Sequence, residues 1–138
     1  SYFRTPYSMD PKSTGPGYQY EPENRNLFLK YEKYLNSILV DKNLNQYRIT
    51  DMWYLYQPDE EWVENPIHQH LTSNKVAVIY LICNSDDNII FYDSNKENPL
   101  TYYPKKGEIV VFDSSTMHKP GPTVGTKRLS LNVELNLV

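Results

Sequence analysis

The 138-residue sequence has one cysteine and one alanine, and it has no excess of positive charge. The lone cysteine, Cys83, rules out a disulfide framework, and its apolar surroundings predict a buried, inert thiol. A formal net charge of −3 provides no basic field, so a nucleic-acid backbone is not expected as the main partner. No apolar run approaches the roughly eighteen residues of a membrane span, and no leader pattern is visible. We therefore expect a soluble, cytoplasmic protein with no signal peptide or transmembrane segment.

The composition also bears on origin and size. Alanine is scarce, while tyrosine and asparagine each occur thirteen times. This bias is typical of an AT-rich genome, such as that of a virus or a streamlined microbe. A chain of 138 residues is long enough to bury one hydrophobic core. We expect a single folded domain over residues 24–138, preceded by an irregular arm over residues 1–23. Tyrosines in this arm suit contacts with a protein partner (Tyr2, Tyr7, Tyr18 and Tyr20).

The periodicity of the apolar residues predicts one helix followed by strands. Apolar residues recur at helical spacing between Leu27 and Leu39, which predicts an amphipathic helix over residues 26–40. From residue 47 on, short aromatic or β-branched runs separated by turn signals are typical of an antiparallel sandwich or barrel. The predicted strands cover residues 47–56, 76–83, 89–93, 108–112 and 128–137. The fold class is therefore mainly β, with one packing helix.

The last predicted strand alternates strictly between leucine or valine and polar residues. Arg128 and Ser130 lie on its polar face, and side chains that alternate in this way point to opposite sides of a sheet. If the polar face is interior, the guanidinium needs an anionic partner. Glu134 on the same face is one candidate, and a carboxylate ligand held by Arg128 and Ser130 is another. The alternative is an outward face with solvated charges.

The chain has only three histidines, and they fall in two short stretches. His68 and His70 are two residues apart, which places both imidazoles on one face of an extended segment. His118 follows fifty residues after His68 and could complete a triangle around one metal ion. Imidazole nitrogen suits Fe, Zn, Cu and Ni. The alternative for each histidine taken alone is an ordinary surface or hydrogen-bonded polar residue.

The order of these motifs resembles the Fe(II)/2-oxoglutarate-dependent oxygenases, and the prolyl-hydroxylase-like branch in particular. The resemblance rests on a histidine motif, a second histidine about fifty residues later, and an arginine ten residues beyond with a small polar residue at Arg+2. Further matching segments cover much of residues 47–136: Met52-Trp-Tyr-Leu-Tyr56, Ile79-Tyr-Leu81, Ile90-Phe-Tyr-Asp93 and Pro104-Lys-Lys-Gly107-Glu-Ile-Val-Val-Phe112.

The resemblance implies a double-stranded β-helix, or jelly roll, with the helix packed outside. It implies Fe(II) bound by His68 and His118, with a third ligand at position 70. It further implies that 2-oxoglutarate is held at its distal carboxylate by Arg128 and Ser130, helped by Tyr80 and, from the strand before the metal motif, by Tyr56. The activity implied is hydroxylation of a substrate coupled to decarboxylation of 2-oxoglutarate to succinate.

The sequence departs from the family pattern at position 70, where the family usually has Asp or Glu. A neutral imidazole there leaves the iron centre one charge unit more positive. His70 could bind iron as in three-histidine thiol dioxygenases, could point away, or could mark a site without chemistry. Two other functions stay open: a jelly-roll binding or structural module, for instance viral, and a three-histidine cupin-type metalloenzyme without 2-oxoglutarate. The substrate, a small molecule or a peptide, is not specified by the sequence.

Overall fold

The computed structural model describes residues 2–6, 18–22, 25–57, 66–122 and 127–138. Within these ranges the chain forms one helix and nine strands, and the helix precedes all but two of the strands. The elements are β1 (Tyr2–Pro6), β2 (Tyr18–Pro22), α1 (Arg25–Asp41), β3 (Tyr47–Gln57), β4 (Lys75–Ile82), β5 (Ile89–Tyr92), β6 (Leu100–Tyr102), β7 (Ile109–Asp113), β8 (Met117–Pro120) and β9 (Arg128–Leu137).

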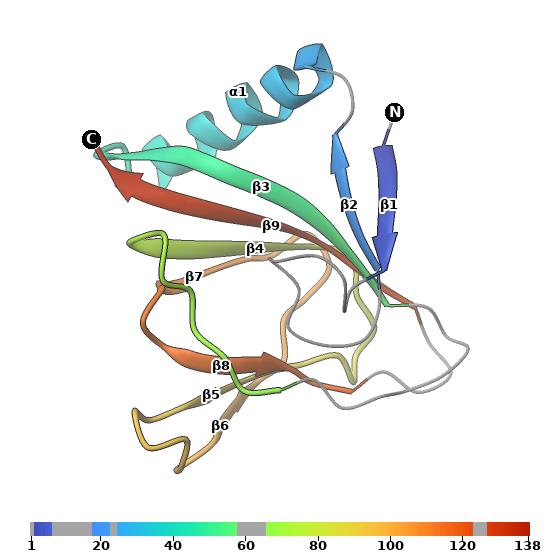
Figure 1. Ribbon diagram of the computed structural model, residues 1–138, viewed down its shortest axis with the longest axis vertical. Helices are drawn as coiled ribbons and strands as arrows, with labels where there is room; N and C mark the ends of the chain where they lie inside the picture. Colours follow the sequence, from blue (N-terminus) through green and yellow to red (C-terminus); the bar gives the residue numbers. More distant parts are fainter. Residues whose placement is uncertain (1, 7–17, 23–24, 58–65, 123–126) are drawn as a thin grey trace.

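The strands form two sheets. The larger has the order β1-β2-β3-β9-β4-β7 and the smaller has the order β6-β5-β8. Every pair of neighbouring strands is antiparallel. Figure 1 shows the helix on one side of the larger sheet and the smaller sheet on the other. This is a double-stranded β-helix with an external packing helix, as the sequence predicted.

β9 lies at the centre of the larger sheet, between β3 and β4. Its apolar residues Leu131, Val133 and Leu135 pack with Leu35 and Leu39 of α1 in the main hydrophobic core. Its polar residues face the other way, and Arg128 and Ser130 are only 2% and 4% exposed. Both faces of this strand are therefore buried, so the strict alternation separates an apolar core from a polar interior rather than from solvent.

The N-terminal arm is more regular than the sequence predicted. We expected irregular structure over residues 1–23, whereas β1 and β2 pair with each other and β2 extends the larger sheet by pairing with β3. Tyrosines favour strands. β1 lies at the edge of the sheet and ends at Pro6, and Pro22 of β2 lies beyond the three residues that pair with β3. Tyr7 lies outside the described residues. The division into an arm and a domain, and the partner contact through the arm tyrosines, stay predictions.

Strand boundaries elsewhere differ from the predicted ones by at most one residue, and β6 and β8 were not predicted. The three residues of β6 are all exposed, so this strand has no buried face to produce a hydrophobic pattern. No helix among the described residues is long and apolar enough to cross a membrane. Cys83 is half-buried rather than buried as predicted. Its thiol lies 3.3 Å from the carbonyl oxygen of Pro104, and desolvation raises its pKa.

Candidate metal centre and adjoining pocket

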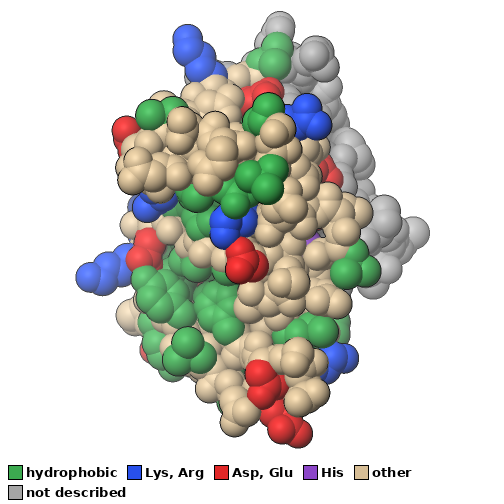
Figure 2. Space-filling model, turned by 90° about the vertical axis from the view of Figure 1, so that its left-hand side faces the viewer, with side chains coloured by type: hydrophobic (Ala, Val, Ile, Leu, Met, Phe, Trp, Pro, Cys, Tyr) green, Lys and Arg blue, Asp and Glu red, His purple; other side chains and the backbone are tan. Residues whose placement is uncertain are grey.

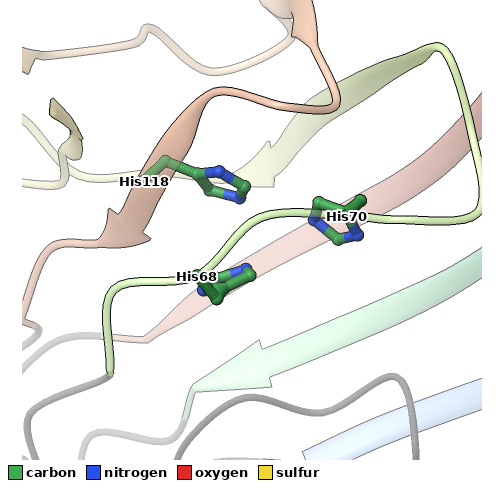
Figure 3. Close-up of side chains that lie close together, drawn as sticks. All are labelled: His68, His70 and His118. Atoms are coloured by element: carbon green, nitrogen blue, oxygen red, sulfur yellow. The ribbon is translucent and has the colours of Figure 1, made fainter. Parts of the chain in front are cut away.

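The three histidines converge between the two sheets. His68 and His70 come from the connection that precedes β4, and His118 comes from β8. His68 and His118 form an isolated antiparallel bridge, in which each backbone N–H donates to the other's carbonyl oxygen at 2.9 Å. His70 is anchored by its own backbone N–H, which donates to the carbonyl oxygen of Ser114 at 2.9 Å. Figure 3 shows the three rings gathered around a common space.

One potential ligand nitrogen from each histidine lies within 4.8 Å of the other two. The prediction that His68 and His70 share a face is confirmed by a centroid distance of 5.3 Å between their rings. They do so in an irregular segment rather than at the opening of a regular strand, because only His68 of this pair has a bridge partner. The rings contribute little to the face of the molecule in Figure 2, which fits their position between the sheets.

Backbone carbonyls fix the orientation of two of the rings. Nδ1 of His118 donates to the carbonyl oxygen of Thr116 at 2.8 Å, and Nδ1 of His68 donates to that of Pro66 at 3.2 Å. Because a carbonyl oxygen can only accept, Nδ1 carries the proton and Nε2 carries the lone pair in both neutral rings. This tautomer is the one that binds a metal through Nε2.

The surroundings keep two of these rings neutral. Burial is the main cause that lowers the pKa of His118 to about 3, and the neighbouring His68 and His70 lower it further. Burial likewise lowers the pKa of His68 to about 4. Phe112 adds to this apolar environment, with its ring edge-on to His118 at a centroid distance of 4.7 Å. Neutral imidazoles at physiological pH are what a divalent metal requires.

His70 differs from the other two histidines in the group beside its Nδ1. Its Nδ1 lies 3.3 Å from Oε1 of Glu134, a β9 residue that is only 8% exposed. The sequence singled out Glu134 as a possible partner of Arg128, but it lies at the opposite end of the polar face of β9, beside His70. The alternation of β9 placed Glu134 on the correct face, whereas its histidine partner depends on the tertiary fold.

A pocket adjoins the three histidines and has a volume of about 40 Å³, several times the ~10–15 Å³ that one water needs. Its wall includes three of the predicted cosubstrate residues, Arg128, Ser130 and Tyr80. Tyr80 and Ser130 are directly opposite each other on β4 and β9. Burial raises the pKa of Tyr80 and Arg128 opposes that rise, so the phenol stays protonated and can donate a hydrogen bond. The lining is Trp53, Leu55, His68, His70, Val76, Val78, Tyr80, Ile89, His118, Pro120, Arg128, Ser130 and Asn132.

The fourth predicted cosubstrate residue, Tyr56, is not in this lining. Trp53 and Leu55 of the same strand do line the pocket, and alternation places Tyr56 on the opposite face of β3. The sequence motif located the strand but not the face that this tyrosine occupies. Gln57, the next residue of β3, lies on the pocket face again and is buried. It is the residue of β3 that pairs with Arg128 of β9.

Arg128 has an internal anionic neighbour that the sequence did not identify. Its Nη1 lies 3.9 Å from Oδ1 of Asp87, and both residues are 2% exposed. The same Nη1 donates to the carbonyl oxygen of Gly121 at 2.9 Å. Asp87 is held in turn by the backbone N–H of Asn84 at 2.7 Å. A loop aspartate without a periodic pattern gives no sequence signal for such a pairing.

No protein-family model matches the sequence, and no curated protein is detectably similar to it. Solved structures do share its fold. A 2OG-Fe(II) oxygenase family oxidoreductase from Burkholderia pseudomallei aligns over 76% of this chain and 56% of its own, at 16% identity and a TM-score of 0.60. A prolyl-4-hydroxylase from Pseudomonas putida aligns over 87% of this chain and 70% of its own, at 17% identity and a TM-score of 0.60.

A prolyl 4-hydroxylase structure from Phytophthora capsici aligns over 81% of this chain and 42% of its own, at 18% identity and a TM-score of 0.53. The predicted resemblance to the 2-oxoglutarate/Fe(II) oxygenases, with prolyl hydroxylases among them, is thus confirmed at the level of the fold. The chain spans little more than half of the first of these neighbours.

Proposed function

We propose that this protein is an Fe(II)/2-oxoglutarate-dependent oxygenase whose metal is held by three histidines. The observation that carries the proposal is that His68, His70 and His118 share one pocket with Arg128, Ser130 and Tyr80. A set of three imidazoles fits Fe(II). The likeness in fold to 2OG-Fe(II) oxygenases supports the assignment by analogy.

The residues on β9 and β4 would bind and orient the cosubstrate. Arg128 offers a guanidinium that is only 2% exposed, which suits a carboxylate in a site shielded from water. Ser130 and Tyr80 add hydroxyl groups opposite each other, and the protonated phenol of Tyr80 donates. Fe(II) with 2-oxoglutarate supplies the activation of O2 for the oxidation of a C–H bond. Trp53, Leu55 and Val78 form the apolar part of the wall and limit access of water.

A three-histidine metalloenzyme that uses no 2-oxoglutarate is the second candidate. The observation that favours it is the buried Asp87 carboxylate near Arg128, because this carboxylate offsets the charge that would attract a ligand carboxylate. In this case the histidines would bind metal in the same way, while Arg128 would serve to brace the Gly121 carbonyl.

Anaerobic titration with Fe(II) and then 2-oxoglutarate distinguishes the two candidates. A visible metal-to-ligand charge-transfer band that needs both components would support the oxygenase. Metal binding without such a band would refute it in favour of the second candidate. His118→Gln is the matched control, because it removes one ligand nitrogen and should abolish the band.

A further inference from the structure

The carboxylate missing from the metal-ligand set has a counterpart directly behind His70. Glu134 Oε1 lies 3.3 Å from His70 Nδ1, on the side of the ring away from Nε2. The hydroxyl of Thr72 lies 3.2 Å from each carboxylate oxygen of Glu134 and donates to them. A carboxylate that is 8% exposed is costly to bury unless such partners hold it.

The groups beside Nδ1 differ among the three rings. The Nδ1 atoms of His68 and His118 donate to backbone carbonyls, which are neutral acceptors. Nδ1 of His70 has a carboxylate beside it. His70 also occupies the sequence position at which the oxygenase pattern has an acidic ligand. The negative charge is therefore displaced from the ligand itself to the group behind the ligand.

We propose that Glu134 is a positioning residue that supplies, through His70, the negative charge that the three-histidine metal face lacks. A carboxylate on Nδ1 fixes the ring so that Nε2 faces the other histidines, and it makes that nitrogen more basic. In a buried site its charge also acts on a divalent cation with little screening. This inference rests on the metal site of the proposed function and not on its cosubstrate.

Glu134→Gln tests this inference, because glutamine keeps the size of the side chain and an oxygen beside Nδ1 and removes the charge. The matched control is Glu97→Gln, which makes the same change at an exposed residue in the β5–β6 connection. Metal-free protein of each variant is titrated with Co(II), and affinity is read from the visible absorption spectrum. We expect Glu134→Gln to weaken Co(II) binding by about 10- to 100-fold and to shift the absorption bands. Glu97→Gln should match the parent.

The outcomes separate this inference from a structural role. Thermal unfolding of the metal-free variants reports any loss of packing; a structural residue would lower that stability and leave the spectrum of the bound Co(II) unmoved. Equal Co(II) affinity and spectra in Glu134→Gln and the parent would overturn the inference.

If the parent still formed the 2-oxoglutarate-dependent band, the proposed function would survive that result. Co(II) binding that depends on Glu134, without any such band, would support the inference and refute the cosubstrate. A parent that binds no metal would overturn both.

Discussion

Acidification should destabilise the metal-free protein at a pH where carboxylates are still ionised. The pKa of His68 is about 4 and that of His118 about 3 in the folded protein, mainly because both rings are buried. In the unfolded chain both return to about 6.5. Below that value the unfolded chain binds more protons than the folded one, so protons favour unfolding. The stability is complete above about pH 6.5 and is lost as the pH falls toward the folded values.

The size of the effect follows from these pKa values. Between pH 8 and pH 5 each ring lowers the free energy of unfolding by about 2 kcal/mol, so the pair lowers it by about 4 kcal/mol. This is a large share of the ~5–15 kcal/mol that holds a typical domain together. The exposed Asp93 and Glu108 also have lowered pKa values, but carboxylates lose their stabilising effect at lower pH than this window.

Urea unfolding of EDTA-treated protein at pH 8, 6.5 and 5 measures the loss directly. The control is the double variant His68→Gln/His118→Gln, which lacks both titrating rings. Its free energy of unfolding should change by about 4 kcal/mol less over the same range. The reasoning is refuted if parent and double variant lose the same free energy between pH 8 and pH 5.

Two further predictions concern the charged pairs of the pocket. Asp87→Asn should tighten 2-oxoglutarate binding, since Arg128 loses its internal anion. Arg128→Ala combined with Asp87→Asn, which leaves no lone buried charge, should weaken 2-oxoglutarate binding by about 30-fold or more and spare Fe(II) affinity. Calorimetric titration of both variants that showed unchanged 2-oxoglutarate affinity would contradict this role for Arg128. His70→Asp would itself supply the negative charge, so Glu134→Gln should weaken Fe(II) binding less in the His70→Asp variant than in the parent. An equal loss of Fe(II) affinity in both backgrounds would show that position 70 and Glu134 are not coupled.

The sequence was sufficient for those parts of the fold that a single periodic segment encodes. The alternation in β9 predicted both its bounds and its two faces, and the helical spacing predicted α1. Tyr56 shows the limit of this reasoning. The strand was found, but β3 is buried on both faces beyond Asp51, so its apolar run does not say which side chains face the pocket.

The site residues that sequence reasoning missed are contact partners of residues that it had already identified. Arg128, His70 and His118 belong to recognisable motifs, whereas Asp87 lies in a loop and Thr72 in an irregular segment, where no pattern marks a contact. Glu134 is the intermediate case, because its face was predicted and its partner was not. A motif names one member of such a pair, and the tertiary fold brings the other member beside it from a different part of the chain.

The register of β9 against β3 and β4 places side chains of β9 at both ends of the site. Arg128 begins the strand beside the proposed cosubstrate site, and Glu134 lies six residues further on, roughly 20 Å along an extended chain, beside His70 of the proposed metal centre. Ser130 and Asn132 lie between them on the same buried face and are joined by a hydrogen bond of 3.1 Å. A one-residue shift of β9 would turn all four polar side chains into the apolar core under α1. The packing of Leu131, Val133 and Leu135 against the helix therefore also fixes the position of the charges around the proposed metal centre.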